Sequence, residues 1–175
     1  FVAPDETTPA AAAAALARNR AVVRTSRITS WLPSYAVKGR RGETLAKRSL
    51  VNCRDVRRPV VYSGLGLLTV LTIDLAKGLA LVDSSSVLAG GQTVYGSQES
   101  LYVATQRWFA QPVAAGDTDP PKMTTTIHKF DVSDPKSTHY RGSGTVPGYL
   151  MSQWSLSEYK GVLRAASTEE PTWWN

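Results

Sequence analysis

Four side chains in the second half of the chain are of the types that enzymes use for acid–base chemistry: His128, Asp131, Glu158 and Tyr159. A histidine and a carboxylate could serve a hydrolase whose site is completed by residues outside this chain. However, no pattern typical of a catalytic nucleophile, a zinc ligand set or a phosphate-binding loop accompanies them. His128 follows Ile127 in an alternating segment, and we expect it to be an exposed strand residue. The sequence therefore predicts no catalytic residue and no cofactor, and a hydrolase is kept only as an alternative.

Metal binding and thiol chemistry have equally little support. Cys53 is the only cysteine, which excludes an internal disulfide and a zinc site built from several cysteines. We expect a buried thiol, or one half of a bridge to a cysteine outside this chain. The stretch 131–134 holds two aspartates, but no calcium-loop spacing follows it. Because an Asp at the end of a strand commonly caps the next turn with its own side chain, we predict turn capping there and no metal site.

The positive charge of the chain is concentrated at its beginning. Residues 1–60 hold 12 Lys and Arg against 4 Asp and Glu, whereas residues 61–175 hold 8 against 10. A basic arm can attract nucleic acid or an anionic polymer. No RNA-binding aromatic motif, zinc-finger spacing or Arg-bearing recognition helix is present. We therefore favour a solvated segment, do not predict a nucleic-acid partner, and keep adhesion to anionic polymers as an alternative. No run of about 18 apolar residues predicts a membrane span.

The residue pattern changes twice along the chain. Residues 1–30 are predicted to be a linker or a short helix, partly disordered, because a run of alanines follows Pro9 without an amphipathic stripe. Residues 31–66 are predicted to be an extended lead-in. From residue 67 onward, short apolar and alternating segments separated by turn residues predict an all-β region. The expected strands are 67–75, 93–96, 101–108, 124–132, 140–146, 149–156 and 162–167.

An internal repeat organises this all-β region. Three pairs of short segments match at separations of 57, 57 and 61 residues, and we place an insertion near residues 155–159 to absorb the difference. The matched pairs are represented, in that order, by Asp74 with Asp131, Gly91 with Gly148, and Leu101 with Val162. One unit therefore predicts four antiparallel strands, with a long loop at residues 111–122 accounting for its length.

The repeat distinguishes between the all-β architectures. A β-sandwich does not need a repeat of this kind, whereas each blade of a propeller buries its faces against its neighbours and so repeats in sequence. We therefore predict about two antiparallel four-stranded blades of an incomplete β-propeller over residues 67–175, after a mostly irregular N-terminal arm. A β-sandwich built from the same strands is the alternative.

Six segments carry a resemblance to a known family, which covers residues from about 50 to 175. In the first repeat they are Leu68–Asp74, Gly91–Ser97 and Leu101–Thr105, and in the second they are Ile127–Asp131, Tyr140–Gly144 and Val146–Tyr149. Together they resemble the bacterial secreted β-propeller domain proteins, which are distant relatives of the WD-type repeats. The resemblance implies an exported or surface-anchored bacterial protein and carries no catalytic set.

The resemblance also implies that more strands are needed than this chain supplies. A propeller closes with about four blades or more, and the repeat here accounts for roughly two. Unpaired strand edges and apolar faces favour pairing with further chains. We therefore expect the remaining blades, or identical chains joined through strand edges, as partners.

A binding or scaffold module is the function that this reasoning favours, because loops at the ends of a propeller carry recognition. The candidate contacts to a protein partner are Trp108, Tyr149 and Trp154, beside the loop 111–122. Aromatic residues also dominate the packing between blades, and packing is the reading that we favour for these three.

Overall fold

The computed structural model describes residues 8–77, 80–107 and 123–169. By internal contacts the chain divides into two units, Phe1–Cys53 and Arg54–Asn175, and each is described here by itself. Most elements of the described residues are strands, in sheets that are almost wholly antiparallel, with one α-helix. The predicted all-β class is therefore confirmed. The predicted boundaries at residues 30 and 66 stay a prediction.

The first unit holds a helix and a hairpin. Helix α1 (Pro9–Thr25) begins with the Thr8 hydroxyl accepting a hydrogen bond from the Ala11 amide (3.2 Å) and with Pro9, whose missing N–H costs nothing there. After the 3₁₀ turn η1 (Ile28–Ser30), strands β1 (Ser34–Lys38) and β2 (Thr44–Ser49) pair antiparallel. Within the described ranges, no helix has the length and apolar character needed to cross a bilayer.

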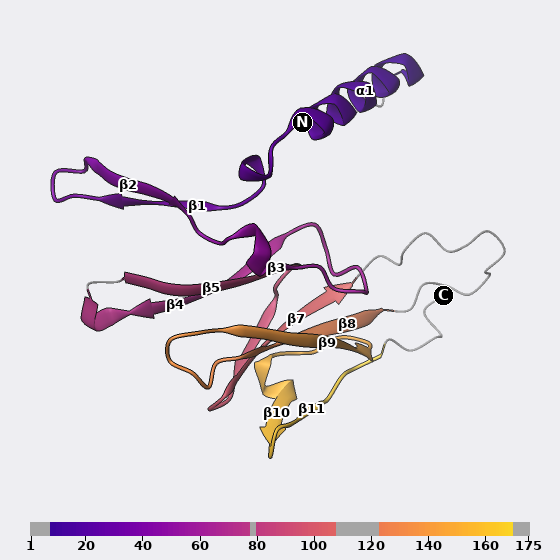
Figure 1. Ribbon diagram of the computed structural model, residues 1–175. Coiled ribbons are helices and arrows are strands. Elements are labelled where there is room, and N and C mark those ends of the chain that lie inside the picture. The colour runs from indigo at the N-terminus through magenta and orange to yellow at the C-terminus, as the bar shows by residue number, and fades with distance from the viewer. Residues whose placement is uncertain (1–7, 78–79, 108–122, 170–175) are drawn as a thin grey trace. The chain divides into compact units, whose positions relative to one another are not determined.

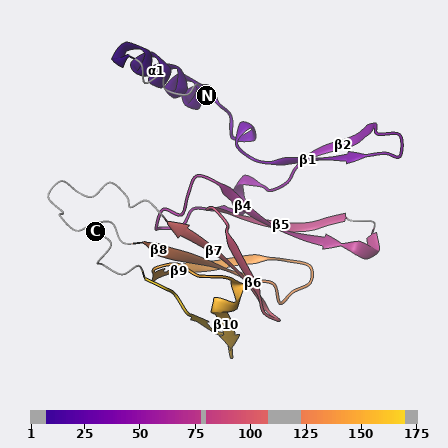
Figure 2. The same cartoon turned by 180° about the vertical axis from the view of Figure 1, so that it is seen from behind.

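The described part of the second unit forms three sheets (Figures 1 and 2). The first has the order β3-β5-β4, from β3 (Val56–Arg57), β4 (Leu67–Asp74) and β5 (Ala80–Leu88). The second is a four-stranded antiparallel meander of β6 (Thr93–Gly96), β7 (Ser100–Arg107), β8 (Thr124–Asp131) and β9 (His139–Pro147). The third is a hairpin of β10 (Leu156–Tyr159) and β11 (Val162–Ala165).

The repeat predicted from the sequence is present, but the sheets do not coincide with it. Each repeat supplies four strands, β4 to β7 in the first and β8 to β11 in the second. The meander instead joins the last two strands of the first repeat to the first two of the second. The expectation that one repeat forms one sheet is therefore wrong, because the four-stranded sheet is shifted by two strands relative to the repeat. Strand periodicity along a chain defines the unit but not which edges pair.

The hairpins β4–β5 and β8–β9 are equivalent in detail. Both are antiparallel, and both contain one register shift at the same place, between Thr72 and Ile73 and between Lys129 and Phe130. These registers set Val87 against Val146, an offset of 59 rather than the expected 57. The connection 132–138 is two residues longer than the connection 75–79, so the first strands match at 57 and the second at 59.

The hairpins β6–β7 and β10–β11 are also equivalent, with an offset of 62 rather than the expected 61. The pair Val94–Val103 then corresponds to Leu156–Ala165. The one-residue difference matters because it moves every side chain of a strand to the other face of its sheet. The expected strand 149–156 is also wrong, since the 3₁₀ turn η4 (Gln153–Ser155) lies there and the strand begins at Leu156.

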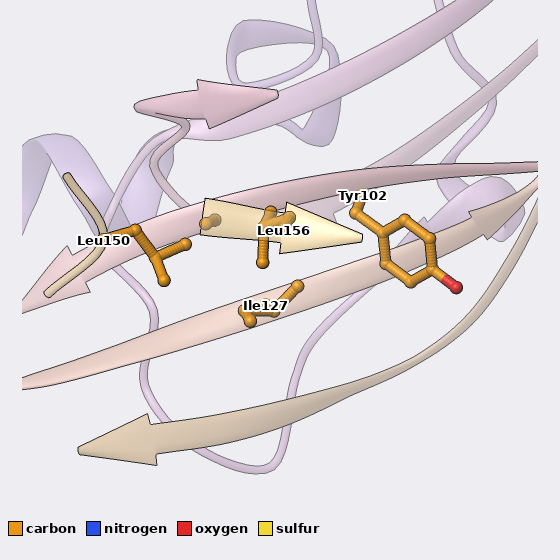
Figure 3. Packing of buried hydrophobic residues seen from close by; sticks show 5 residues of the cluster. Tyr102, Ile127, Leu150 and Leu156 are labelled. Atoms are coloured by element: carbon orange, nitrogen blue, oxygen red, sulfur yellow. The ribbon is translucent and has the colours of Figure 1, made fainter. Parts of the chain in front are cut away.

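Two apolar clusters hold the three sheets together. On one face of the meander, Val103 and Phe130 pack with Val87 and Ala89 next to Leu68 of the β4–β5 hairpin. The opposite face is covered by a second cluster, shown in Figure 3, which the β10–β11 hairpin and its lead-in complete. That cluster consists of Tyr102, Ala104, Ile127, Leu150 and Leu156. The meander is therefore a central layer with one hairpin packed on each face.

Candidate binding surfaces

His128, the first of the candidate acid–base residues, is fully buried, so the expectation of an exposed strand histidine is wrong. Its Nδ1 lies 3.2 Å from the Tyr140 hydroxyl, and its Nε2 has no hydrogen-bond partner in the described part of the chain. Burial lowers the pKa of the imidazole, because the charged form would lose its hydration. A neutral, solvent-excluded His128 serves packing rather than proton transfer with a substrate.

Asp131 caps a turn, as predicted. Its Oδ1 accepts hydrogen bonds from the Ser133 amide (3.0 Å) and hydroxyl (2.6 Å), and its Oδ2 accepts from the Arg141 guanidinium (2.6 Å). These bonds, those of Ser133 foremost, hold the pKa of the carboxyl far below its usual range. Asp74 repeats the arrangement by accepting from the Ala76 amide at 3.0 Å. Both carboxylates therefore stabilise the ends of equivalent strands.

Glu158 joins two sheets. Its Oε2 accepts hydrogen bonds from the hydroxyls of Tyr102 and Ser97, each at 2.8 Å, and its amide donates to the Tyr95 hydroxyl at 3.0 Å. The bond from Tyr102 is the main reason that the pKa of Glu158 lies below its usual value. Tyr159, its neighbour, is exposed on β10. The four acid–base candidates therefore have separate hydrogen-bond partners and surroundings, and do not share one site.

Trp154 is the prominent side chain among the three predicted contact residues. It is 85% exposed on η4, and Met151, two residues before η4 begins, is 78% exposed. Tyr149 instead forms a backbone bridge with Thr168, with both N–O distances at 2.9 Å. Trp108 lies outside the described residues. Packing between sheets therefore does not account for Trp154, and Met151 was missed because nothing in the sequence marks it as exposed.

A cavity of about 400 Å³ lies between β11 and the outer half of the meander. Its apolar walls include Leu163 and Ala165 from β11 and Ile127 from β8. The β9 side is open because Gly142 and Gly144 carry no side chain there. The remaining lining residues are Tyr102, Lys129, Arg141, Ser143, Thr145 and Val146. The sequence reasoning did not find this cavity, because it depends on which faces of distant strands meet.

No metal centre emerges from the described part of the chain, where no group of three or more His, Cys, Asp and Glu side chains lies together. Cys53 is a free and exposed thiol, so the expectation of a buried thiol is wrong. A bridge to a cysteine of another chain stays a prediction.

Comparison with known protein families identifies the family that has this architecture. The model of the β-propeller domain matches residues 8–175, nearly the whole chain. The chain belongs to the β-propeller domain family. Comparisons with curated proteins and with solved structures give no match.

The meander β6-β7-β8-β9 is accordingly a complete propeller blade, and the two hairpins that flank it are half-blades. The β10–β11 hairpin is equivalent to the first two strands of a blade, β6 and β7. The β4–β5 hairpin is equivalent to the last two, β8 and β9. Packing of successive blades face to face explains why each face of the complete blade carries one half-blade.

Proposed function

We propose that this chain is a non-catalytic binding or scaffold module of a secreted bacterial β-propeller protein. The observation that carries the proposal is the exposure of Trp154 and Met151 on the turn that leads from the complete blade into β10. Tryptophan and methionine are enriched where proteins bind one another. A large aromatic side chain that is held out into solvent by a capped turn is suited to insert into a partner.

Rigid local structure supports this role. The Ser152 hydroxyl accepts a hydrogen bond from the Trp154 amide at 3.2 Å and caps the turn. The Gln106 side-chain amide donates to the Leu150 carbonyl at 3.0 Å, which fastens the preceding segment to β7. A contact residue on a fixed turn loses little conformational entropy when it binds.

The non-catalytic part of the proposal rests on how the polar groups are used. The buried imidazole of His128 faces packed side chains, and the carboxylates of Asp131 and Glu158 accept hydrogen bonds within the fold. A general acid or base has to reach the reacting group of a substrate. These three groups are instead engaged in holding strands and blades in place.

The test of this proposal is site-specific photo-cross-linking in producing bacterial cells. A photoreactive amino acid at position 154 should give protein adducts in the culture medium or the envelope fraction. The same amino acid at the exposed Lys136, on the connection between β8 and β9, should give few or no adducts. Equal labelling at both positions, or adducts only with cytoplasmic proteins, would contradict a specific secreted binding module.

Adhesion to anionic polymers through the N-terminal arm is a second candidate, because the arm's basic side chains are solvent-exposed. Arg18, Arg20 and Arg24 on α1 and Lys47 and Arg48 on β2 are all exposed. Binding of this kind weakens steeply with salt. Retention of the chain on heparin resin that is lost between about 0.1 and 0.5 M NaCl would support it, and salt-independent retention would exclude it.

A further inference from the structure

A second, polar cavity of about 160 Å³ lies beside β5 and the connection between β8 and β9. All of its lining residues belong to the second unit. Residues 83–85 of β5 and residues 137–140 form two of its walls. Asp55, at the end of the 3₁₀ turn η2 (Cys53–Asp55), and Arg57 on β3 form the third. A cavity of this size suits a small chemical group rather than a large ligand.

Ser85 points into this cavity and has no partner in the fold. Its neighbours two positions away on β5 both face the complete blade. The Asp83 Oδ2 accepts a hydrogen bond from the Thr138 amide at 2.7 Å, and Val87 packs with Phe130. Alternate residues of a strand share one face, so Ser85 faces the complete blade as well and lines the cavity. It is 6% exposed, yet its hydroxyl forms no hydrogen bond with any described residue. Side chains buried so deeply are usually hydrogen bonded, which indicates a bound group in the cavity.

Two carboxylates offer further acceptors beside this hydroxyl. Val56 on β3 pairs with Ser86 on β5, which places Asp55 alongside Ser85. The carboxylate of Asp55 forms no hydrogen bond or ion pair with a described residue. Asp83 uses only its Oδ2 in the bond to the Thr138 amide, so its Oδ1 is available.

The basic side chains of the cavity are already engaged at its rim. Arg57 is exposed, and its Nη1 donates to the Arg54 carbonyl. His139 is exposed, and its Nε2 lies 3.2 Å from the Ser137 hydroxyl. With two carboxylates against one guanidinium, the lining carries one net negative charge when the histidine is neutral. The cavity therefore favours a cation over an anion.

The propeller architecture does not require these polar groups. At the offset of 59 between β5 and β9, Asp83 corresponds to Gly142 and Ser85 to Gly144. The β8–β9 hairpin keeps the same register and the same shift without either side chain. The carboxylate and the hydroxyl are therefore particular to this one cavity, as groups that contact a ligand would be.

We infer that this cavity binds a primary ammonium group, such as the end of a lysine side chain or of a small alkyl amine. An ammonium has three donors and no acceptor. The carboxylate of Asp55, the Oδ1 of Asp83 and the hydroxyl of Ser85 are three acceptors without a competing partner in the described chain. Hydrogen bonds between an ammonium and a carboxylate are strengthened by charge.

Other small ligands fit these groups less well. A neutral sugar would leave the net negative charge of the lining uncompensated. A bare metal ion would need more ligands, because no group of three or more His, Cys, Asp and Glu lies together in the described residues. The lining does not include Trp154 or Met151, so this inference does not rest on the proposed function.

Nuclear magnetic resonance titration of the isotope-labelled full chain tests the inference. At about pH 7, where the amine is protonated, n-butylammonium chloride should shift the backbone amides of residues 83–85 and 137–140. We expect saturation with a Kd of about 1–10 mM. Sodium chloride at the same ionic strength and n-butanol, which has the same stem without the charge, should not shift them. No saturable shift up to about 50 mM amine, or equal shifts with n-butanol, would overturn the inference.

A second probe separates the two sources of the ammonium group. Tighter binding of Nα-acetyl-lysine amide than of n-butylammonium would indicate a lysine side chain of a protein partner, because its amide groups add contacts at the rim. Tighter binding of n-butylammonium would indicate a free amine. Both results support an ammonium site.

A matched pair of variants assigns the binding to the carboxylate. Asp55→Asn keeps the shape of the side chain, removes its charge and breaks no bond to a described residue. It should weaken n-butylammonium binding at least about 10-fold. Glu99→Gln is the control, because it removes one carboxylate from an exposed position outside the cavity. It should bind like the unmodified chain, and equal weakening in both variants would overturn the inference.

Ser85→Ala separates ligand binding from a structural role. Since the hydroxyl has no partner in the fold, the free energy of unfolding should be unchanged or higher in this variant. Binding of n-butylammonium should weaken about 3-fold or more. A less stable variant that binds as before would overturn the inference. Cross-linking at position 154 does not depend on this cavity, so the proposed function and the ammonium site are tested separately.

Discussion

Ile73 and Phe130 occupy the same position in two hairpins of identical register, yet Phe130 is fully buried and Ile73 is 45% exposed. The difference arises because a half-blade packs on Phe130 from outside its hairpin, whereas no described residue covers Ile73 to the same extent. Equivalent positions in a repeat protein therefore have unequal energetic roles.

Phe130→Ala should destabilise the second unit strongly. The ring packs with Val87 and Val103 and contacts Tyr140 edge-on at a centroid distance of 5.4 Å. Its loss removes buried apolar area and leaves a cavity, which costs about 3–5 kcal/mol. Ile73→Ala, at the half-exposed equivalent position, should cost less than about 1.5 kcal/mol. Urea denaturation measures the free energy of unfolding of both variants, and similar losses would show that the two positions are packed alike.

His128 should make the chain less stable in mild acid. Its pKa in the fold lies below the value of 6.5 that it has when unfolded, so the unfolded chain binds more protons in the interval between them. The free energy of unfolding therefore falls as the pH decreases below about 6.5. His128→Leu, which installs the residue that β4 carries at this position, should flatten that dependence in urea titrations between about pH 5 and 7. An unchanged slope would mean that the imidazole titrates normally.

Tyr102→Phe should loosen the β10–β11 half-blade. The change removes the hydroxyl that donates to Glu158 and leaves the ring, which is almost wholly buried, in place. The cost should be about 1 kcal/mol, because solvent screens the carboxylate. Hydrogen exchange should become faster in β10 and β11 and stay unchanged in β4 and β5. In the unmodified chain the contribution should be present above about pH 4.5 and be lost as Glu158 is protonated below that, because its pKa is lower in the fold.

Gly148→Ala should be much more damaging than Gly144→Ala. Gly148 has a φ of +71°, and a Cβ there would collide with the backbone of Thr168, to which Tyr149 is hydrogen bonded. Left-handed backbone and the collision together should cost about 2 kcal/mol or more. Gly144 has open space at its Cβ, so its replacement should change stability by less than about 1 kcal/mol. Thermal unfolding of the two variants provides the comparison, and equal midpoints would contradict it.

Much of the architecture follows from local sequence. Alternating β-branched segments and the turn residues between them predict strands, and the 57-residue spacing of Asp74 and Asp131 predicts a repeated unit. Both aspartates cap their turns through bonds to residues two positions further on. Such interactions are local, so the amino-acid order is enough to predict them.

The tertiary structure decided everything that depends on partners far apart in the chain. The pairing of β7 with β8 across the repeat boundary shifts the blade by two strands relative to the repeat. The register of the β10–β11 hairpin sets its offset from β6–β7 at 62 residues. The folded structure also buries His128, which local alternation alone places in solvent. Periodicity along a strand gives two faces but not which neighbour covers each, because burial depends on packing between segments that are distant in sequence.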